Sequence, residues 1–528
     1  MYKTRLALII ILLINFNIFS QAEEQITVND TINNLSTTND VVDFFSISLS
    51  DDELNDDTSA SDNISGLLNS SMDVFYRTAA YEFSSSFFKV RGLDSDNAFV
   101  HINGIKMNKL YNGRPQWSNW GGLNDVLRNQ ELSNGSIPLK YNFGGILGSN
   151  NINIRASEYG EGGRITYSSS NRSYSNRLMA TYNSGMLEKG WAYSLSIGRR
   201  WGNEGYQDAS FYDSNSAFLS VQKIFNSKHS LNLAAIYAPN RRGKVSPNTQ
   251  EVYDLKGIKY NEYWGYQDGE KRNSRVKRVV EPIILLNHDW SIDENSSLET
   301  SIGYQFGEMG NSRLDYAGGG NPSPAYYQDL PSYFLADTNG PDYEGAYIAQ
   351  ENFVNDGQIN WNRIYDANVT NNLSNLNAAY VLYEDRVDDT QLTINSAYNR
   401  EINENIKITS SVNYRNLVSD NFAEISDMLG GYSYSNIDSF DNLDYNLLSP
   451  NSIVSDGDKF KYHYKMNAEE LSLFSMINFS YNKLEFYLAG DLTNTTYQRD
   501  GIFENEANAG NSSGKGEEIK FGGYGVKA

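Results

Sequence analysis

Alternating apolar and polar residues, repeated in many short stretches, constrain the fold of this chain more than any other feature. In the stretch 406–415, isoleucine, valine and tyrosine fall on one side of an extended chain, while Lys407 and Arg415 fall on the other. The stretches 298–306 and 484–489 repeat the pattern. Successive side chains of a β-strand point to opposite faces, so each stretch predicts a strand with one apolar and one polar face.

The pattern predicts about twelve strands, and the segments between them differ sharply in length. Three strand pairs are joined by tight turns, whereas 239–279, 307–389 and 416–469 are long connections. A soluble β-sandwich would share the alternation, but structureless loops of this length count against an ordinary compact domain. Short turns on one side and long loops on the other are typical of an outer-membrane β-barrel. We expect the strands near residues 164–171, 174–183, 190–200, 216–225, 229–238, 280–290, 297–306, 390–400, 406–415, 470–481, 483–492 and 519–527, with the tight turns at 226–227, 293–296 and 403–405.

Hydropathy and aromatic placement agree with a barrel. The mean hydropathy is −0.55, and no long apolar run appears after Ser20, which excludes helical transmembrane segments in that part of the chain. Trp191, Trp201, Trp290 and Tyr398 lie near the ends of predicted strands, where the interfacial aromatic girdles of barrels belong.

The N-terminus has the order of a secretory signal. Lys3 and Arg5 precede an apolar run from Leu6 to Phe19, and the small residues of Ser20-Gln21-Ala22 follow. A membrane anchor is the alternative, but the run is short and an acidic stretch follows it. We therefore predict a signal peptide over residues 1–22 and an exported mature protein.

Three segments follow the predicted signal. Residues 23–62 are rich in Asp, Asn, Ser and Thr, which predicts a flexible acidic linker. Residues 63–160 have a mixed pattern, with a strand expected at 98–102 and the tight-turn dipeptide Asn103-Gly104 directly after it. Residues 161–528 contain the alternating strands and form the predicted barrel segment.

Two motifs in the mixed segment resemble the plug domain of TonB-dependent outer-membrane receptors. Phe88-Lys-Val-Arg-Gly-Leu-Asp94, followed by Val100-His-Ile-Asn-Gly-Ile105, is similar to that plug's "RG…NG(V/I)" strands. Phe143-Gly-Gly-Ile-Leu-Gly-Ser-Asn-Asn-Ile-Asn-Ile154 is similar to its closing segment, which leads into the first barrel strand. Each motif is weak alone, but their order and spacing make the combination fairly specific. The plug-motif residues are Arg91, Gly92, Asp94, Asn103, Gly104, Gly144, Gly145 and Gly148.

The resemblance implies a mixed α/β plug domain followed by an antiparallel transmembrane β-barrel. Gly144, Gly145 and Gly148 would allow tight turns and close backbone approach where the plug meets the barrel wall. Family barrels have about twenty-two strands, so we expect about half of a barrel here, in a fragment or a truncated gene product. Arg199-Arg-Trp-Gly202 and the segment from Gly318 to Tyr327 resemble receptors of Bacteroidetes-type bacteria.

Two segments are candidates for contact with partners. Ile26-Thr27-Val28 is the candidate TonB box; Val41-Val42 is an alternative, and plain linker sequence explains either equally well. The longest predicted loop contains aromatic residues that favour ligand recognition, although loop packing explains them about as well. These candidate ligand-loop residues are Tyr326, Tyr327, Tyr333 and Phe334.

Chemistry other than binding has little support in the sequence. The four histidines are scattered, cysteine is absent, and no hydrolase, zinc-protease or phosphate-loop spacing appears. His101 lies inside a predicted strand, which favours a structural role. The net charge of −22 argues against nucleic-acid binding. We therefore predict a non-enzyme with no catalytic residues, no metal site and no cofactor.

The sequence and the resemblance together favour a TonB-dependent receptor of the cell outer membrane, with a periplasmic plug and extracellular loops, that imports an unidentified ligand. The resemblance implies TonB, with ExbB and ExbD, as partners, contact with outer-membrane lipid, and a surface lipoprotein as a further candidate partner. Siderophore, haem, vitamin, oligosaccharide and peptide cargoes all stay open. The alternatives are a non-transporting binding or adhesin barrel, a truncated inactive receptor fragment and, as a distant third, an enzyme built on the barrel.

Overall fold

A computed structural model describes residues 46–49, 93, 95–133, 137–169, 174–336 and 340–528. The predicted signal peptide, the candidate TonB box at Ile26, Thr27 and Val28, and the motif residues Arg91, Gly92 and Asp94 lie outside the described residues. In the part of the chain that is described, no helix is long and apolar enough to cross a membrane.

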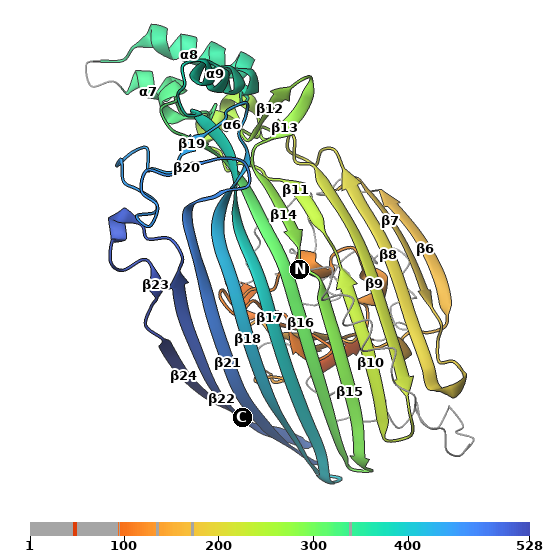
Figure 1. The fold of residues 1–528 in the computed structure, drawn as a ribbon. Helices are drawn as coiled ribbons and strands as arrows, with labels where there is room; N and C mark the ends of the chain where they lie inside the picture. The colour runs from red at the N-terminus through yellow and green to blue at the C-terminus, as the bar shows by residue number, and fades with distance from the viewer. Residues whose placement is uncertain (1–45, 50–92, 94, 134–136, 170–173, 337–339) are drawn as a thin grey trace. The chain divides into compact units, whose positions relative to one another are not determined.

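A fifteen-stranded antiparallel sheet, which we call the wall, dominates the described residues (Figure 1). Its strands make twelve passes, because β10 with β11, β14 with β15 and β23 with β24 each form one interrupted pass. Pro239 and Pro282 fall at the first two interruptions, as expected for a residue that cannot donate to the ladder. The strands are β6 (Gly162–Ser169), β7 (Asn176–Asn183), β8 (Trp191–Gly202), β9 (Tyr212–Ile224), β10 (His229–Tyr237), β11 (Asn240–Gly243), β14 (Val276–Val280), β15 (Ile283–Asp293), β16 (Ser296–Tyr316), β17 (Tyr380–Asn403), β18 (Ile406–Asp427), β21 (Lys459–Tyr481), β22 (Leu484–Gly501), β23 (Gly514–Lys515) and β24 (Ile519–Lys527).

Each of the twelve predicted strands overlaps one pass of the wall, but the passes are longer than the alternation indicated. The strand expected at 390–400, for example, is β17, which begins at Tyr380. Charged residues such as Glu384, Asp385 and Arg386 occupy both faces of its first half, so the alternation is lost while the backbone ladder continues. The long connections are correspondingly shorter than predicted.

These connections also contain structure of their own, which corrects the expectation of structureless loops. Helices α6 and α8 pack together in one small apolar core with Val252, Tyr260 and Phe353, and α9 buries Trp361 in another. The elements are α6 (Gln250–Lys256), β12 (Trp264–Gln267), β13 (Glu270–Asn273), η8 (Tyr327–Asp329), α7 (Pro331–Leu335), α8 (Tyr343–Asp356), α9 (Trp361–Leu373), β19 (Tyr434–Ser435), β20 (Ile453–Val454) and η9 (Glu506–Asn508). A further short helix, η7 (Glu188–Gly190), lies in the connection between β7 and β8.

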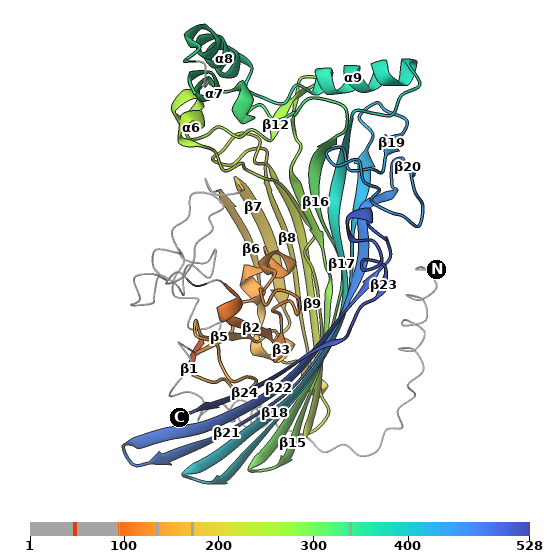
Figure 2. The ribbon, with the colours of Figure 1, turned by 90° about the vertical axis from the view of Figure 1, so that its left-hand side faces the viewer.

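A second, five-stranded sheet has the order β1-β4-β5-β2-β3 and lies on the concave side of the wall (Figure 2). We call its described part from 95 to 159 the plug. Strands β2 and β5 are parallel and the other pairs are antiparallel; β1 comes from the segment predicted as linker. The elements are β1 (Ser46–Leu49), η3 (Ser95–Asn97), β2 (Phe99–Ile102), β3 (Ile105–Lys106), η4 (Trp117–Trp120), η5 (Asn124–Val126), β4 (Gln130–Ser133), β5 (Ser149–Ile152) and η6 (Ala156–Glu158).

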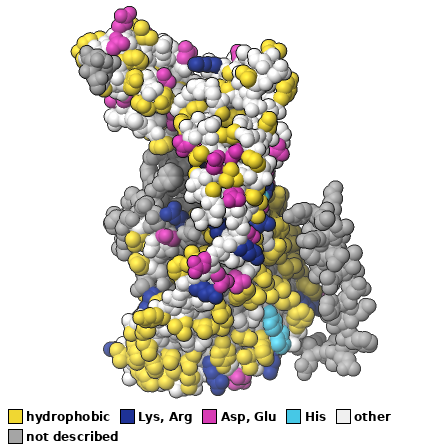
Figure 3. Space-filling model, turned by 60° about the vertical axis from the view of Figure 1, so that its left-hand side comes forward, with side chains coloured by type: hydrophobic (Ala, Val, Ile, Leu, Met, Phe, Trp, Pro, Cys, Tyr) yellow, Lys and Arg dark blue, Asp and Glu magenta, His cyan; other side chains and the backbone are white. Residues whose placement is uncertain are grey.

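One apolar core joins the plug to the wall. Ile102, Ile105 and Leu123 of the plug are buried with Phe218 and Leu285 of the wall. The outward face of the wall carries a belt of apolar side chains towards the end with the tight turns (Figure 3), including exposed Leu471, Leu473, Leu484, Phe486 and Leu488. The predicted fold class, a plug followed by part of an antiparallel barrel, is confirmed.

Candidate functional site: the plug and the lumen face of the wall

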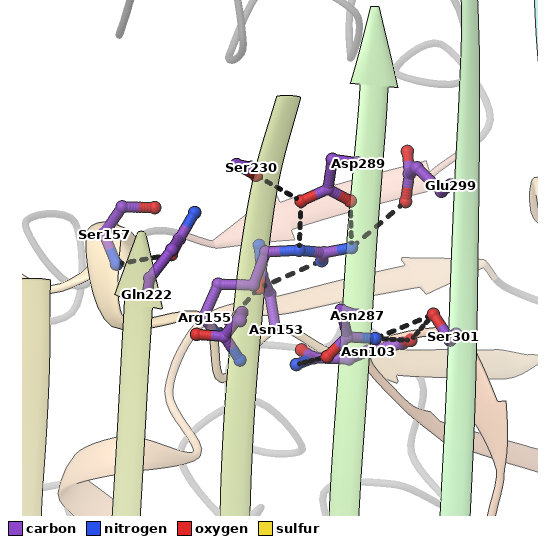
Figure 4. A network of polar contacts seen from close by, with 12 residues as sticks. Asn103, Asn153, Arg155, Ser157, Gln222, Ser230, Asn287, Asp289, Glu299 and Ser301 are labelled. Carbon is purple, nitrogen blue, oxygen red and sulfur yellow. Dashed lines mark hydrogen bonds and ion pairs between the residues drawn. The ribbon is translucent and has the colours of Figure 1, made fainter. Parts of the chain in front are cut away.

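The Asn103-Gly104 turn is one point at which the plug meets the wall. Both residues have positive φ, 47° and 78°, and connect β2 to β3 as the dipeptide predicted. The Asn103 carbonyl accepts hydrogen bonds from Asn287 Nδ2 at 3.1 Å and Ser301 Oγ at 2.9 Å (Figure 4). The Gly104 carbonyl accepts one from Asn395 Nδ2 at 2.7 Å. The turn's two carbonyls thus bind three wall strands, and we call this contacted side of the wall its lumen face.

A buried charge cluster forms a second contact. Arg155 donates from Nε and Nη2 to Asp289 at 3.2 and 2.9 Å, and its Nη2 also reaches Glu299 at 3.3 Å. Glu299 further accepts from Lys140 Nζ at 2.8 Å and from the Tyr141 hydroxyl at 2.7 Å. These five residues, Arg155, Lys140, Tyr141, Asp289 and Glu299, are called the Arg155 cluster below.

The Arg155 cluster is balanced in charge, with two cations from the plug and two carboxylates from the wall. Burial disfavours the charged form of Arg155, but Asp289 and Glu299 outweigh that effect and raise its pKa well above the usual value. For Lys140 too, burial opposes the charge, and Glu299 raises the pKa. Both side chains therefore stay charged at neutral pH and tie the plug to β15 and β16.

Lys109 of the plug forms a third contact, at the break between β14 and β15. Its Nζ donates to Glu281 and, at 2.8 Å, to Asp389, and Asn119 Nδ2 donates to the other Glu281 oxygen at 2.8 Å. Burial opposes the charge of Lys109, yet the two carboxylates raise its pKa. On the far side, Arg415 of β18 donates to the Asn108 carbonyl.

The glycines of the closing segment have mostly the local reasons predicted. Gly144 and Gly148 have φ of 87° and 92°, which favours glycine. A Cβ on Gly145 would lie 2.4 Å from the Asn97 carbonyl oxygen, so this close approach is within the plug rather than to the wall. In this respect the expectation for Gly145 was wrong.

The four loop aromatics lie together around α7. Edge-to-face contacts join Tyr326 to Tyr327 at 4.9 Å, Tyr327 to Tyr333 at 5.8 Å, and Tyr333 to Phe334 at 5.6 Å between ring centroids. Tyr327 and Tyr333 are exposed. The row suits stacking on a flat or apolar ligand, and its role in binding stays a prediction.

His101 is buried inside β2, in agreement with a structural role. Burial, and next the charge of Lys106, lower its pKa to about 3. In the described part of the chain, no three or more His, Asp or Glu side chains are grouped as a metal site. Lys109, Lys140, Arg155 and their wall partners were not found from the sequence, because single-sequence patterns carry no signal for pairs so far apart.

Comparisons with known proteins give structural matches only. No family model matches the chain, and no curated protein matches it significantly in sequence. The ferric-catecholate import receptor Fiu from E. coli K12, in its open form, aligns with a TM-score of 0.51 and 11% identity, over 91% of this chain and 66% of that one. The ferric yersiniabactin uptake receptor FyuA from Yersinia pestis aligns with a TM-score of 0.48 and 10% identity, over 91% and 60%.

The described residues have the fold of the plug and part of the barrel of TonB-dependent receptors. The chain spans less than two thirds of the length of each of these two solved structures. At this identity the likeness concerns the fold alone, so the more specific resemblance to Bacteroidetes-type receptors stays a prediction.

Proposed function

We propose that this chain acts as a TonB-dependent receptor that imports a ligand across the outer membrane. The proposal includes the segments expected from the sequence: a signal peptide at 1–22, a linker with the TonB box at 23–62, a plug at 63–160 and a barrel segment at 161–528. TonB, with ExbB and ExbD, supplies the energy. The extracellular loops, including the four loop aromatics around α7, bind the ligand first. No bond is made or broken in this scheme.

The observation that carries the proposal is the polar character of the contact between plug and wall. Beside the shared apolar core, the contact includes the Arg155 cluster, the Lys109 pairs and the Asn103-Gly104 turn. Water can replace such partners when the plug moves, because exposed ions and amides are well solvated. A purely apolar contact would offer no comparable route to reversible movement.

Thiol labelling in cells tests the proposal, since the chain has no cysteine of its own. Ala156 is buried where the plug meets the wall. In full-length protein carrying Ala156→Cys, we expect a water-soluble maleimide to label the thiol several-fold faster in cells with TonB than in cells without it. Tyr327→Cys, on the exposed loop, is the matched control and should label equally in both. Equal labelling of Ala156→Cys in the two strains would contradict TonB-driven plug movement and favour a non-transporting barrel.

A further inference from the structure

Three pairs of cations face each other across β11 and β14 of the wall. Two pairs lie on one face of the sheet, and the third, Arg241 with Arg278, lies on the other face, where Arg278 is paired with Glu308. In the ladder between β11 and β14, Arg242 is the direct partner of Lys277. Two residues further along the same ladder, the Lys244 amide donates to the Arg275 carbonyl at 2.7 Å. The side chains of Lys244 and Arg275 are therefore opposite each other as well. We call Arg242, Lys244, Arg275 and Lys277 the basic ladder.

The register places the basic ladder on the lumen face. Lys277 is the partner of Asn311 on β16, and Asn311 is the partner of Asp385 on β17. Direct cross-strand partners share a face, and so do residues two or four apart on one strand. Asp385 is four residues from Asp389, which holds Lys109 of the plug. The basic ladder therefore faces the lumen, beyond the plug and towards the loops.

The charges of the basic ladder are not balanced by the described residues. No ion pair involving any of its four members occurs in the described part of the chain. The nearby carboxylates are engaged elsewhere: Glu281 and Asp389 hold Lys109, and Asp385 holds Arg313 at 2.6 Å. Burial, and then the charges of Arg313, Arg275 and Arg242, lower the pKa of Lys244.

This arrangement is unfavourable for the protein alone. Like charges directly opposite each other destabilise a sheet. The chain as a whole has a net charge of −22, so four unpaired cations on one patch are not explained by a generally basic composition. Unfavourable like-charge arrangements of this kind are expected at functional sites, where a ligand supplies the opposite charge that the protein lacks.

We propose that the basic ladder is a binding site for a multiply charged small anion bearing carboxylate or phosphate groups, and that this anion is the cargo. The two guanidinium groups of Arg242 and Arg275 can each donate two parallel hydrogen bonds to such a group, and Lys244 and Lys277 add point charges. The role of this anion as cargo rests on the proposed transport function, whereas its binding to the basic ladder does not depend on TonB.

Titration calorimetry on the purified full-length receptor tests the site, with citrate and inositol hexakisphosphate as probes and neutral maltotriose as the reference sugar. We expect both anions to bind, more weakly as salt is raised, and maltotriose not to bind at this site. Arg242→Gln and Lys277→Gln should each weaken anion binding about tenfold. Arg241→Gln is the matched control, because Arg241 is the next residue on the same strand and points to the opposite face; its affinity should stay within about twofold of the wild type.

The outcomes separate the two proposals. Absence of anion binding by the wild type at low salt, or equal losses in Arg241→Gln and Arg242→Gln, would overturn the anion site. If Ala156→Cys still labels in a TonB-dependent way in that case, the transport function stands without the anion site. Should anions bind as expected while labelling ignores TonB, the site stands and the transport function fails.

Discussion

The wall residues of the Arg155 cluster and the basic ladder lie on the same face of one sheet, yet the charges of the cluster are paired and those of the ladder are not. In the Arg155 cluster every buried cation has a carboxylate within 3.3 Å, and the partners come from plug and wall. In the basic ladder cations stand opposite cations, and no described carboxylate pairs with them. The first arrangement fixes two parts of the chain together, and the second leaves a place for a partner from outside.

This difference in charge pairing indicates that the two groups of residues have different roles on the lumen face. Charges that serve the fold are balanced internally, since an unpaired buried charge is strongly destabilising. Charges that serve a ligand stay unbalanced until it arrives.

Removing Arg155 should have the largest effect. In Arg155→Met, Asp289 and Glu299 lose a buried cation, which costs about 3–5 kcal/mol of stability. Denaturant unfolding of the full-length protein should show this loss, and limited proteolysis should show earlier release of the plug. Arg241→Gln, on the outward face, is the control and should change little. A midpoint in Arg155→Met equal to that of the control would contradict the tight docking described here.

Substituting Gly104 tests the turn that contacts the wall. Gly104 has φ of 78°, and a Cβ there would lie 2.8 Å from the Tyr141 ring. Gly104→Ala should therefore lower stability by about 1–3 kcal/mol. Gly160→Ala, where a Cβ would meet nothing within 4 Å, is the matched control for thermal unfolding. Equal midpoints for the two variants would show that the turn is not held as described.

The buried His101 should make the plug sensitive to acid. Its folded pKa of about 3 lies below the ordinary value of 6.5, so on acidification the unfolded chain takes up a proton first. The contribution of His101 to stability is therefore fully present above pH 6.5, and at most about 1.4 kcal/mol of it is lost per pH unit below that value. His101→Gln should flatten this dependence when unfolding midpoints are compared at pH 7 and pH 5. An unchanged slope would show that His101 is not excluded from water.

The smallest expected effect is a gain. Without an anion, Lys277→Gln removes one like-charge pair with Arg242, so stability should rise by about 0.5 kcal/mol. Thermal unfolding at low salt measures this gain, and added citrate should narrow or reverse the difference because it stabilises the wild type more than the variant. A loss of stability in Lys277→Gln at low salt would mean that its charge is already balanced.

The wall was predictable from the sequence wherever one face is apolar and the other polar. The two faces of 406–415 are as predicted: Val412 is exposed on the outside, and Arg415 is buried against the plug. The Asn103-Gly104 turn was predictable because its signal is local. The upper half of β17 was missed because charges on both faces hide the alternation.

The pairs that join plug to wall could not be predicted. Arg155 and Asp289 are 134 residues apart, and nothing in either neighbourhood marks the other as its partner. The basic ladder did leave a sequence trace, since Arg241-Arg242-Gly-Lys244 and Arg275-Val-Lys277-Arg278 are basic runs in an acidic chain. Only the register shows which members of those runs share a face.

Cross-linking tests most directly whether the plug docks on the lumen face of the wall. Asn103 Nδ2 donates to Asn287 Oδ1 at 2.8 Å, whereas Leu286 is the next residue of β15 and points to the opposite face. With a short bifunctional methanethiosulfonate, full-length Asn103→Cys/Asn287→Cys in outer membranes should cross-link in high yield, and Asn103→Cys/Leu286→Cys should not. Equal yields, or no cross-link in the first pair, would contradict the docking and the account of function built on it.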